Sequence, residues 1–459
     1  MNSGEGIGAA EVVDDPIYKL KRMHTVETMF KRILPLAAGL LLGTALSLTA
    51  VRVAVAWNLW PNRELNRSTD YVREVLEMVH ENYVDEKSAS YDQLAKTAIH
   101  GMVESLDPHS EFLESKDNKE LEEDLSGEFG GIGIQVETRE GKVVVIAPIA
   151  GTPGERAGIQ RGDEIVSIDG KSVERDGARD DVVGRLRGAP KTKVAVGLYR
   201  PATKKNIELT LIRELIKVES VRDVHVIDGD VGYIHLTEFS EHTGDQFHRA
   251  VNGLLKQGVR NLVIDMRNNP GGLLDSAVEV AEPFFKNGEL IVYTQGRKPT
   301  DRDEYKAETE GEPLALPIAI LINSGTASAA EVVTGALKDM SRAVVVGERS
   351  FGKGSVQSIF KLKNGEGMRL TTARYYTPSG VNIHERGITP HVEVVMSPEE
   401  DSKLARQRSR ADITDPKEFN ERFGFEPIED RQLQAALDVL KGVRLLDARA
   451  GKPLSQLTR

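Results

Sequence analysis

The sequence lacks several features on which whole classes of protein depend. It has no cysteine in 459 residues, which excludes disulfide bonds, thiolate metal sites and a cysteine nucleophile. It also lacks an excess of basic residues, because 60 Lys and Arg stand against 71 Asp and Glu, a formal net charge of −11. Nucleic-acid binding needs concentrated positive charge, so that class is disfavoured. Charged residues make up 29% of the chain, which excludes a mainly membrane-embedded protein.

The common motifs of hydrolytic sites are absent as well. The sequence has no Gly-x-Ser-x-Gly elbow and no His-Glu-x-x-His zinc motif, and no Ser-x-x-Lys pair stands at a plausible helix start. The ten histidines form no pair with metal-ligand spacing apart from His242 and His248, on a predicted surface helix. We therefore expect neither a metal nor a cofactor.

One long uncharged run, residues 33–51, departs from this polar average. Its 19 residues would span about 28 Å as a helix, close to the thickness of a bilayer core. Basic residues are denser before the run than after it, which favours a cytoplasmic N-terminus. A cleaved signal peptide is the alternative, since residues 54–56 have the small-x-small form of a cleavage site. The 32-residue leader favours an anchor over 33–57, with the tail 1–32 in the cytoplasm and the rest exported.

Changes of pattern divide the remaining chain into four parts. Apolar residues first recur every four positions, as in helices, and the acidic stretch 114–128 that follows is interpreted as a solvated helix face or linker. Short strands come next, and then strands and helices alternate, which indicates a sheet with parallel strands covered by helices. The predicted parts are a helical segment (64–125), a strand-rich module (126–214), an α/β core (215–396) and a charged helical C-terminal region (397–459).

A strand-to-helix junction at 318–331 offers three hydroxyl groups as candidate nucleophiles: Ser324, Thr326 and Ser328. At the first turn of a helix, free backbone N–H groups and the positive end of the helix dipole can stabilise an oxyanion. Ser and Thr also favour an ordinary helix N-cap, and the stretch alone does not choose among the three. A serine nucleophile would also need a base.

The glycine-rich stretch 351–357 contains a candidate base, Lys353. A lysine with its ordinary pKa of about 10.4 is protonated, so burial would have to lower that pKa. Gly352 and Gly354 let the backbone pack closely around it, and Gln357 could orient the amine without adding charge. Spacing alone favours a flexible loop with an exposed lysine.

A third glycine turn, at 268–272, follows the predicted strand 262–266. Its backbone N–H groups could complete an oxyanion site. On local evidence, a tight turn that opens the next helix is the better interpretation.

Together, these stretches resemble the carboxyl-terminal processing proteases, or tail-specific proteases, a family of serine peptidases with a PDZ domain beside a catalytic α/β core. The resemblance runs from about residue 66 to 394, and the agreement of so many motifs in order is highly specific. With the membrane helix predicted from the uncharged run, it implies a multidomain α+β and α/β fold with a helical segment, a PDZ domain and a ClpP/crotonase-like protease core. The motifs are Ser105 to Ser110, Phe129 to Ile134, Gly162 to Ile165 with Asp169-Gly170, Asp265 to Gly272, Ser324 to Glu331, Phe351 to Gln357, and Tyr375 to Gly380.

The resemblance also implies a role for each candidate residue. The family uses a Ser-Lys dyad supported by Gln, and its nucleophile is the middle serine of a Ser-Ala-Ser-Ala-Ser-Glu run. That position is Ser328 here, the general base is Lys353 and the orienting residue is Gln357. The implied oxyanion donors are the backbone N–H groups of Ala329 and of Gly271 or Gly272.

This sequence departs from the family pattern at three positions. Thr326 and Ala330 stand where serines are common, which puts loop packing and rate in question before activity. His384 lies in a stretch that more often carries a basic residue and a glutamine, so it either alters substrate contacts or is an exposed strand residue.

The PDZ resemblance implies a peptide-binding role for the strand-rich module. A glycine-rich loop of a PDZ domain presents N–H groups to a peptide's terminal carboxylate, and the peptide pairs with the following strand. The predicted helix 176–186 would form the opposite wall, and Arg187 either couples the groove to the active site or is a solvated helix-end residue. The loop and strand here would be Gly131, Ile132, Gly133 and Ile134.

We therefore expect a serine endopeptidase that cleaves protein substrates near an exposed C-terminal tail. The expected location is the bacterial inner membrane, with the catalytic part facing the periplasm or the cell exterior. A homo-oligomer or an adaptor protein is a possible further partner. The alternative function is a non-catalytic PDZ scaffold that only binds peptides. A trypsin-like protease is disfavoured, since no Gly-Asn-Ser-Gly-Gly-type loop is present.

Overall fold

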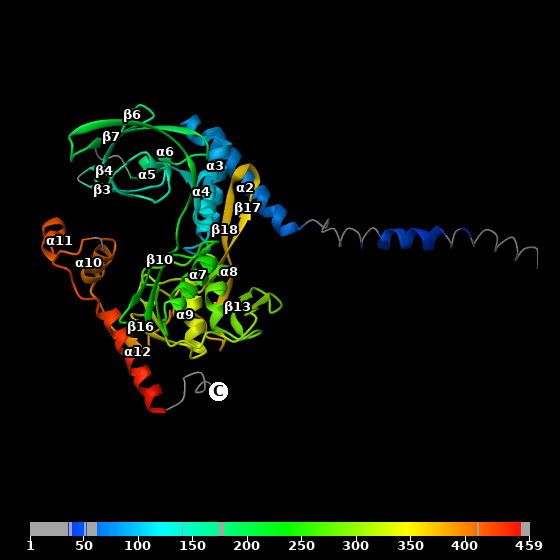
Figure 1. Ribbon diagram of the computed structural model, residues 1–459. Coiled ribbons are helices and arrows are strands. Elements are labelled where there is room, and N and C mark those ends of the chain that lie inside the picture. Colours follow the sequence, from blue (N-terminus) through cyan, green and yellow to red (C-terminus); the bar gives the residue numbers. More distant parts are fainter. Residues whose placement is uncertain are drawn as a thin grey trace, which may run out of the picture. The chain divides into compact units, whose positions relative to one another are not determined.

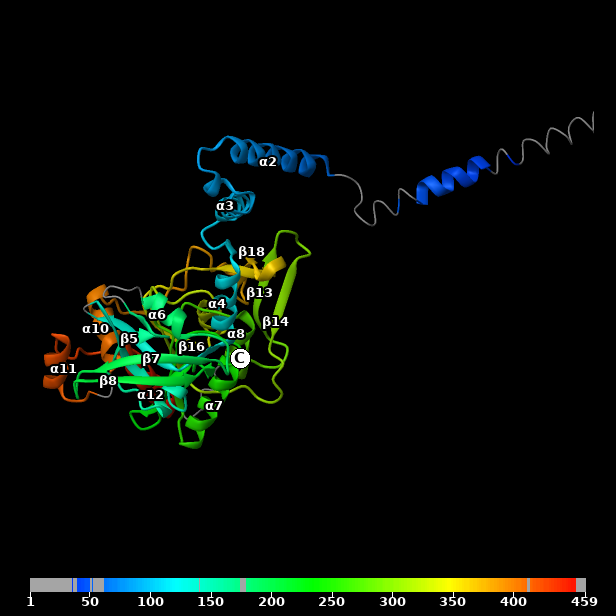
Figure 2. The ribbon, with the colours of Figure 1, turned by 90° about the horizontal axis from the view of Figure 1, so that it is seen from above.

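The computed structural model describes residues 35, 39–49, 52, 62–139, 141–173, 179–410 and 413–450 (Figures 1 and 2). The chain forms two compact units, Met1–Ala98 and Ile99–Arg459, which are treated separately below. The predicted cytoplasmic tail, 1–32, and the alternative cleavage site, 54–56, lie outside the described residues.

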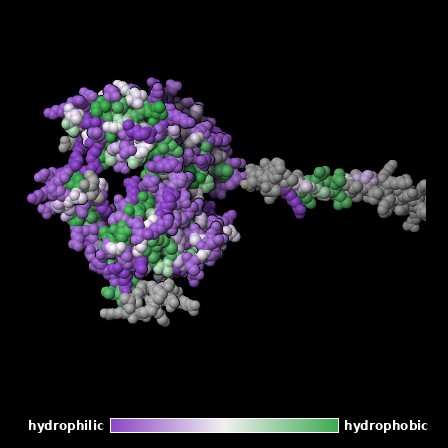
Figure 3. Space-filling view, in the orientation of Figure 1, coloured by the Kyte–Doolittle hydropathy of each residue, from purple (hydrophilic) through white to green (hydrophobic). Residues whose placement is uncertain are grey.

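The first unit contains the part of the predicted anchor that is described. Residues 39–49 are helical, and their leucines are exposed and form a hydrophobic surface (Figure 3). No helix among the described residues is long and apolar enough to cross a membrane. Helix α2 (Arg63–Asn82) follows, and Asn62 caps it by accepting hydrogen bonds from two backbone N–H groups. The 3₁₀ helix η1 (Glu86–Ala89) connects α2 to α3 (Tyr91–Glu104).

The strand-rich module of the second unit is a small sheet flanked by short helices. Its strand order is β3-β4-β5-β7-β8, with β6 beside β5, so β3 lies at an edge. Helix α6 (Arg179–Leu186) closes the module, while residues 176–178 of the predicted helix 176–186 are not described. The elements are β3 (Ile134–Arg139), β4 (Lys142–Pro148), α5 (Pro153–Arg156), β5 (Glu164–Ile168), β6 (Lys171–Ser172), β7 (Lys193–Arg200) and β8 (Lys205–Ile212).

Two strands join this module to the rest of the unit. β2 (Glu128–Gly131) runs antiparallel to β9 (Glu214–Lys217). The segment that enters the module and the segment that leaves it therefore lie side by side. Before β2, the acidic stretch forms α4 (Ser115–Ser126), which ends at Gly127 in the left-handed conformation.

The α/β core contains a six-stranded sheet in the order β10-β11-β12-β15-β16-β19. All neighbours are parallel except β10 and β11. Parallel strands with both faces covered are expected to be apolar throughout, and β15 has the sequence Ile-Ala-Ile-Leu-Ile, fully buried. The strands are β10 (Val221–Ile227), β11 (Val231–Leu236), β12 (Asn261–Asp265), β15 (Ile318–Ile322), β16 (Ala343–Gly347) and β19 (Val392–Glu393).

Helices cover the two faces of this sheet (Figure 1). On one face α7 (Thr243–Lys256), α8 (Leu274–Ala281) and α9 (Ala329–Asp339) bury the main hydrophobic core. On the other, α12 (Arg431–Ala450) packs its apolar residues against Tyr233, Leu321 and their neighbours. The turns at the carboxyl ends of β12 and β15 lead into α8 and α9, which brings both predicted glycine turns to one edge of the sheet.

A second, antiparallel sheet was not predicted from the sequence. Its order is β1-β18-β13-β14, with β17 also paired to β18 (Figure 2). The long strands β17 and β18 are only partly buried and carry many polar residues, so they lack the apolar runs that marked the core strands. The strands are β1 (Glu111–Leu113), β13 (Leu290–Gly296), β14 (Arg302–Lys306), β17 (Ser355–Lys361) and β18 (Gly367–Tyr376).

The C-terminal region contains α10 (Pro398–Arg408), α11 (Pro416–Phe423) and α12, and buried charges fix it to the core. Arg267, just after β12, is almost fully buried and contacts Asp265 at 2.6 Å and Asp430 at 2.8 Å. Arg408 of α10 contacts Asp265 as well, at 2.9 Å. Burial opposes ionisation of Asp265, but Arg267 holds its pKa well below the usual range.

Candidate active site

Ser328 lies at the N-terminus of α9, in the turn that follows β15. Its backbone has φ 54° and ψ −119°, a conformation that non-glycine residues rarely adopt and that costs on the order of 1–3 kcal/mol. The residue is 8% exposed. Such a strained turn presents a hydroxyl group beside the free N–H groups of a helix start, where the dipole favours negative charge.

The turn that carries Ser328 is tied to the glycine turn after β12. The Thr326 hydroxyl accepts a hydrogen bond from Asn323 N (3.0 Å) and donates one to Met266 O (2.8 Å). The N–H of Ala327 donates to Asn269 O at 2.9 Å. Thr326 is one of the departures from the family pattern. Its hydroxyl acts both as a donor and as an acceptor, and these hydrogen bonds maintain the packing of the loop.

Glu331 joins the Ser328 turn to the loop that carries Lys353. It is fully buried on the first turn of α9, and burial raises its pKa. Its Oε2 accepts hydrogen bonds from the backbone N–H groups of Ser328 (2.9 Å) and Lys353 (2.8 Å). Its Oε1 accepts from Ser350 Oγ (2.5 Å) and from the N–H of Gly352 (2.7 Å). The Glu331 carboxylate therefore fixes the distance between the backbone segments that carry Ser328 and Lys353.

Lys353 is half-buried in the loop between β16 and β17. Burial lowers its pKa, and the positive charge of Arg369 on β18 lowers it further. Both effects favour the neutral amine that a general base requires. A Cβ on Gly354 would lie 2.2 Å from His384 N, and one on Gly352 would lie 2.9 Å from Gly387 N. The glycines are therefore required by close backbone contacts, which places the loop in a fixed position.

Gln357 on β17 lies at one end of a chain of hydrogen bonds. Its Nε2 donates to Thr371 Oγ1 at 2.8 Å, across the β17–β18 pair. The Thr371 N–H donates to Ser110 Oγ (3.1 Å), and that hydroxyl donates to Asp107 Oδ2 (2.8 Å). The buried Oε1 of Gln357 has no partner among the described residues. The hydrogen bond to Thr371 therefore fixes the orientation of the Gln357 amide, and its Oε1 remains free to accept a hydrogen bond.

Tyr375 on β18 lies close enough to the Ser328 side chain for Ser328 to lower its pKa. Burial has the larger effect and raises the pKa of Tyr375 to about 12, so the phenol stays protonated. The Tyr375 N–H donates to Gly354 O at 2.8 Å, which ties this strand to the Lys353 loop. Among the described residues no hydrogen bond joins Ser328 directly to Lys353, and Glu331 connects their two segments.

The two candidate oxyanion glycines differ in what their N–H groups contact. Gly271 packs against the nucleophile turn, since a Cβ there would lie 2.7 Å from Ser328 Cβ. Its N–H, however, donates to Asn269 Oδ1 at 2.9 Å. Within the described chain, the N–H of Gly272 has no hydrogen-bond acceptor. Ala329 is the first residue of α9, where backbone N–H groups have no partner within the helix.

The histidines serve other contacts. His242 lies beside Glu128 (3.0 Å between Nε2 and Oε1), and His248 Nε2 lies 2.8 Å from Glu279 O. His384 packs against Gly354, near the candidate base, and is largely buried instead of exposed. Within the described part of the chain, no group of three or more His, Asp or Glu side chains is placed to hold a metal ion.

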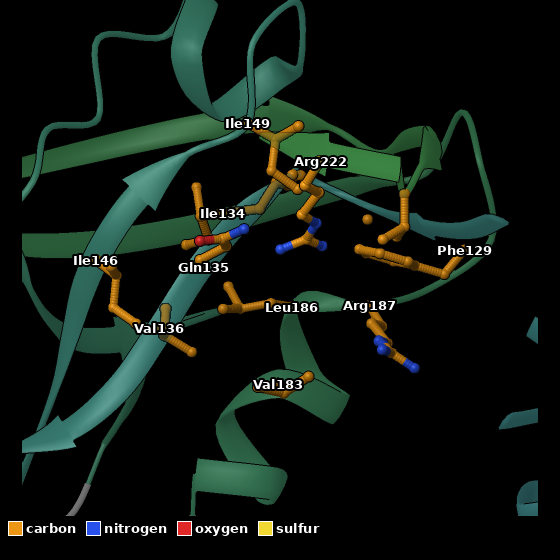
Figure 4. A pocket seen from close by; sticks show the side chains of 14 residues that line it. Phe129, Ile134, Gln135, Val136, Ile146, Ile149, Val183, Leu186, Arg187 and Arg222 are labelled. Carbon is orange, nitrogen blue, oxygen red and sulfur yellow. The ribbon is translucent and has the colours of Figure 1, made fainter. Parts of the chain in front are cut away.

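A groove of about 380 Å³ lies between β3 and α6 in the strand-rich module (Figure 4). Its walls are mostly apolar, and the predicted loop residues Gly131, Ile132, Gly133 and Ile134 all line it. The N–H groups of Ile132 and Gly133 have no hydrogen-bond partner in the described chain. The remaining lining residues are Phe129, Gln135, Val136, Ile146, Ile149, Val183, Leu186, Arg187, Val218 and Arg222.

Arg187, at the end of α6, lines this groove and contacts α4. Its guanidinium lies 3.6 Å from Glu123 and 4.6 Å from the centre of the Phe129 ring. The residue is therefore half-buried and in contact with neighbours, unlike a solvated helix-end arginine. None of these contacts is with the Ser328 or Lys353 segments.

Fold and site together define a PDZ-bearing serine peptidase: a groove beside a free strand edge stands in the same unit as a buried serine whose turn is joined through Glu331 to the loop of a lysine with a lowered pKa. Family models agree with this division, matching the PDZ domain at residues 130–211 and peptidase family S41 at 230–394.

Comparison with known proteins identifies the family. The chain is 35% identical, over 90% of its length and 96% of the relative's, to a carboxy-terminal-processing protease of Bartonella bacilliformis. It is 37% identical to a probable CtpA-like serine protease of Staphylococcus aureus, over 82% of this chain and 74% of that one. Among solved structures, the photosystem II D1 C-terminal processing protease is 32% identical, with 72% of this chain and 95% of that chain covered and a TM-score of 0.40. The chain belongs to the carboxy-terminal-processing proteases of peptidase family S41.

Three residues of the site were not predicted as functional from the sequence. Glu331 and Tyr375 lie inside motifs that marked the family, and Ser110 closes another, but the pattern gave none of them a role. Their roles depend on contacts between segments far apart in the chain. The one signal available was the spacing of Glu331 three positions after Ser328, which is that of a helix capping box.

Proposed function

We propose that this protein is a serine endopeptidase that cuts substrates near their C-terminal tails with a Ser328–Lys353 dyad. The observation that carries the proposal is the strained Ser328 at the start of α9, fixed through Glu331 to the loop of a lysine whose pKa burial lowers. Gln357 orients Lys353 through its free Oε1.

The reaction proceeds in two halves. The Ser328 hydroxyl turns toward Lys353, and Oγ attacks the scissile carbonyl carbon while its proton moves to Lys353 Nζ. The N–H groups of Ala329 and Gly272 hold the oxyanion, since Gly271 is engaged by Asn269. The C–N bond breaks as Lys353 returns the proton to the leaving amine. Water then attacks the acyl ester, giving one proton to Lys353, which passes it back to Ser328 as the carboxylic acid product leaves and ionises in the solvent.

Substrate capture is assigned to the groove between β3 and α6. A peptide that pairs with the free edge of β3 would place its terminal carboxylate at Ile132 and Gly133 and its last side chain against the apolar wall. Gly131 and Ile134 shape the two ends of this loop, and Arg187 lines its floor.

We place the enzyme in the bacterial inner membrane, anchored by residues 33–57, with its catalytic part in the periplasm or cell exterior. The uncharged run 33–51 and the exposed leucines of 39–49 support this location. A homo-oligomer or an adaptor protein is a further proposed partner. An externally added protease would test a periplasmic location. It should leave the catalytic part intact in whole cells and degrade it once the outer layer of the cell envelope is opened.

Cleavage of a tail-bearing protein substrate tests the function. Ser328→Ala and Lys353→Ala should each reduce kcat by roughly 10³-fold or more, while Ser324→Ala, an exposed serine in the same junction, should leave the rate unchanged. Full activity in either dyad variant would refute the dyad. Binding of a C-terminal peptide without any cleavage by the unaltered protein would instead favour the scaffold.

A further inference from the structure

Arg222 enters the peptide groove from outside the PDZ domain. It lies on β10, an edge strand of the catalytic sheet, and the pairing with β11 shifts register directly after it. Figure 4 shows its guanidinium inside the groove, between Gln135 and the Phe129 ring. An arginine of the protease core is therefore part of the surface on which the peptide would bind.

No ion pair joins Arg222 to a carboxylate in the described chain, although, against the raising effect of burial, its charge acts to lower the pKa of the nearby Glu238 and Asp223 carboxyl groups. Its Nε donates to Glu219 O at 2.9 Å, which leaves both terminal nitrogens for a ligand. The neighbouring carboxylate of Asp223 faces His235, with 3.3 Å between Oδ2 and Nδ1. Arg187, the other arginine of the groove, is already paired with Glu123. Of the two arginines that line this mostly apolar groove, Arg222 is the one without an ion pair in the described chain.

The groove supplies only part of what a carboxylate needs. The free N–H groups of Ile132 and Gly133 can donate one hydrogen bond each, but a carboxylate removed from water also needs an opposite charge. A guanidinium with two free terminal nitrogens meets that need, because its fork matches the two carboxylate oxygens.

We propose that Arg222 binds the terminal carboxylate of the substrate peptide together with the Ile132–Gly133 loop. This inference rests on the proposed peptide-binding function of the groove. It makes recognition of a free C-terminus a joint property of the two domains, since Arg222 belongs to the catalytic sheet. Gln135 and Arg222 also line a second cavity, of about 430 Å³, which reaches Asn268 beside the oxyanion turn.

The test compares one fluorescent peptide with an apolar last residue in two forms, a free acid and a C-terminal amide. Binding is measured by anisotropy on the full chain carrying Ser328→Ala, which prevents cleavage. We expect the acid to bind at least about tenfold more tightly than the amide. Arg222→Met should remove most of that preference without weakening amide binding, and Arg222→Lys should retain part of it.

Arg139→Met is the matched control, because this exposed arginine lies at the far end of β3 and does not line the groove. Unchanged amide binding shows that a variant is folded. A preference for the acid that survives Arg222→Met, or an equal loss for both peptides, would overturn the role of Arg222 while leaving the groove's function intact. If the parent chain binds neither peptide, the proposed groove function fails and this inference with it.

Discussion

The peptide groove and the catalytic centre use their residues in opposite ways. The groove is open and mostly apolar, and two of its backbone N–H groups and one arginine are left for a ligand. In the candidate active site the supporting groups are hydrogen-bonded to one another, and the carboxylate of Glu331 alone accepts four hydrogen bonds, while Gln357 Oε1 and the Gly272 N–H stay free in the described chain. On the proposed roles, recognition depends on groups left free for a ligand, whereas the chemistry depends on side chains held in position by hydrogen bonds. Changes in the centre should act on kcat, and changes in the groove on KM.

The largest effect beyond the dyad is expected at Glu331. Glu331→Gln replaces one acceptor oxygen by an NH₂ group that faces N–H donors, so two segments lose their common attachment. We expect kcat to fall roughly 10²-fold and the free energy of unfolding to fall by about 1–3 kcal/mol, measured by steady-state kinetics and urea denaturation. Glu348→Gln, a half-buried carboxylate after β16 that accepts from Met396 N, is the control. An unaltered kcat in Glu331→Gln would show that the Ser328 and Lys353 segments keep their positions without the Glu331 carboxylate.

A smaller effect on kcat is expected at Ser110. Ser110→Ala breaks the chain from Asp107 through Thr371 to Gln357, so the amide that orients Lys353 becomes less well fixed. We expect kcat to fall about tenfold with KM nearly unchanged. Ser115→Ala removes a comparable long-range hydrogen bond, to Asn364 O, and should leave both constants unaltered. A change in KM alone would contradict the role of these hydrogen bonds in positioning Lys353.

On the groove side, Ile149→Ala should raise KM and spare kcat. Ile149 is half-buried and lines the groove, so its truncation removes apolar contact with the peptide but none with the catalytic segments. We expect a KM about fivefold higher for tail-bearing substrates. A fall in kcat of the same size would mean that the groove and the centre do not divide binding from chemistry.

The smallest effect on the maximal rate is expected from Arg369→Met, which should instead move the pH profile. Lys353 acts as a base only when neutral, so activity rises as the pH passes its pKa. Burial lowers that pKa and Arg369 lowers it further, so loss of the cation raises the pKa. The rising limb of kcat should therefore shift to higher pH. Glu111→Gln, which removes the ion-pair partner of Arg369 but keeps the cation, should not shift it upward. A shift to lower pH in Arg369→Met would contradict the assignment.

Much of the fold was predictable because the core strands are buried on both faces. Continuous apolar runs such as that of β15 mark parallel strands, and glycine turns mark their ends. The antiparallel sheet was missed because β17 and β18 are half-exposed and pair across a short turn without an apolar pattern. Residues 39–49 are helical and expose their leucines, and the anchor over 33–57 stays a prediction.

At the site, spacing alone left the nucleophile open among Ser324, Thr326 and Ser328, and only the family resemblance chose Ser328. The structure gives the three different surroundings: Ser324 is exposed, Thr326 is used in packing, and Ser328 has the strained backbone. Glu331 and Tyr375 could not be assigned from the sequence, since each acts by joining segments that only the tertiary fold brings together.

The central claim is that Ser328 is a nucleophile because Lys353 deprotonates it. Treatment of the full chain with a fluorophosphonate, followed by peptide mass spectrometry, tests this directly. We predict one covalent adduct, on Ser328, whose rate of formation rises with pH and falls at least about 10²-fold in Lys353→Ala. An adduct on another serine, or one that forms equally fast without Lys353, would contradict the account.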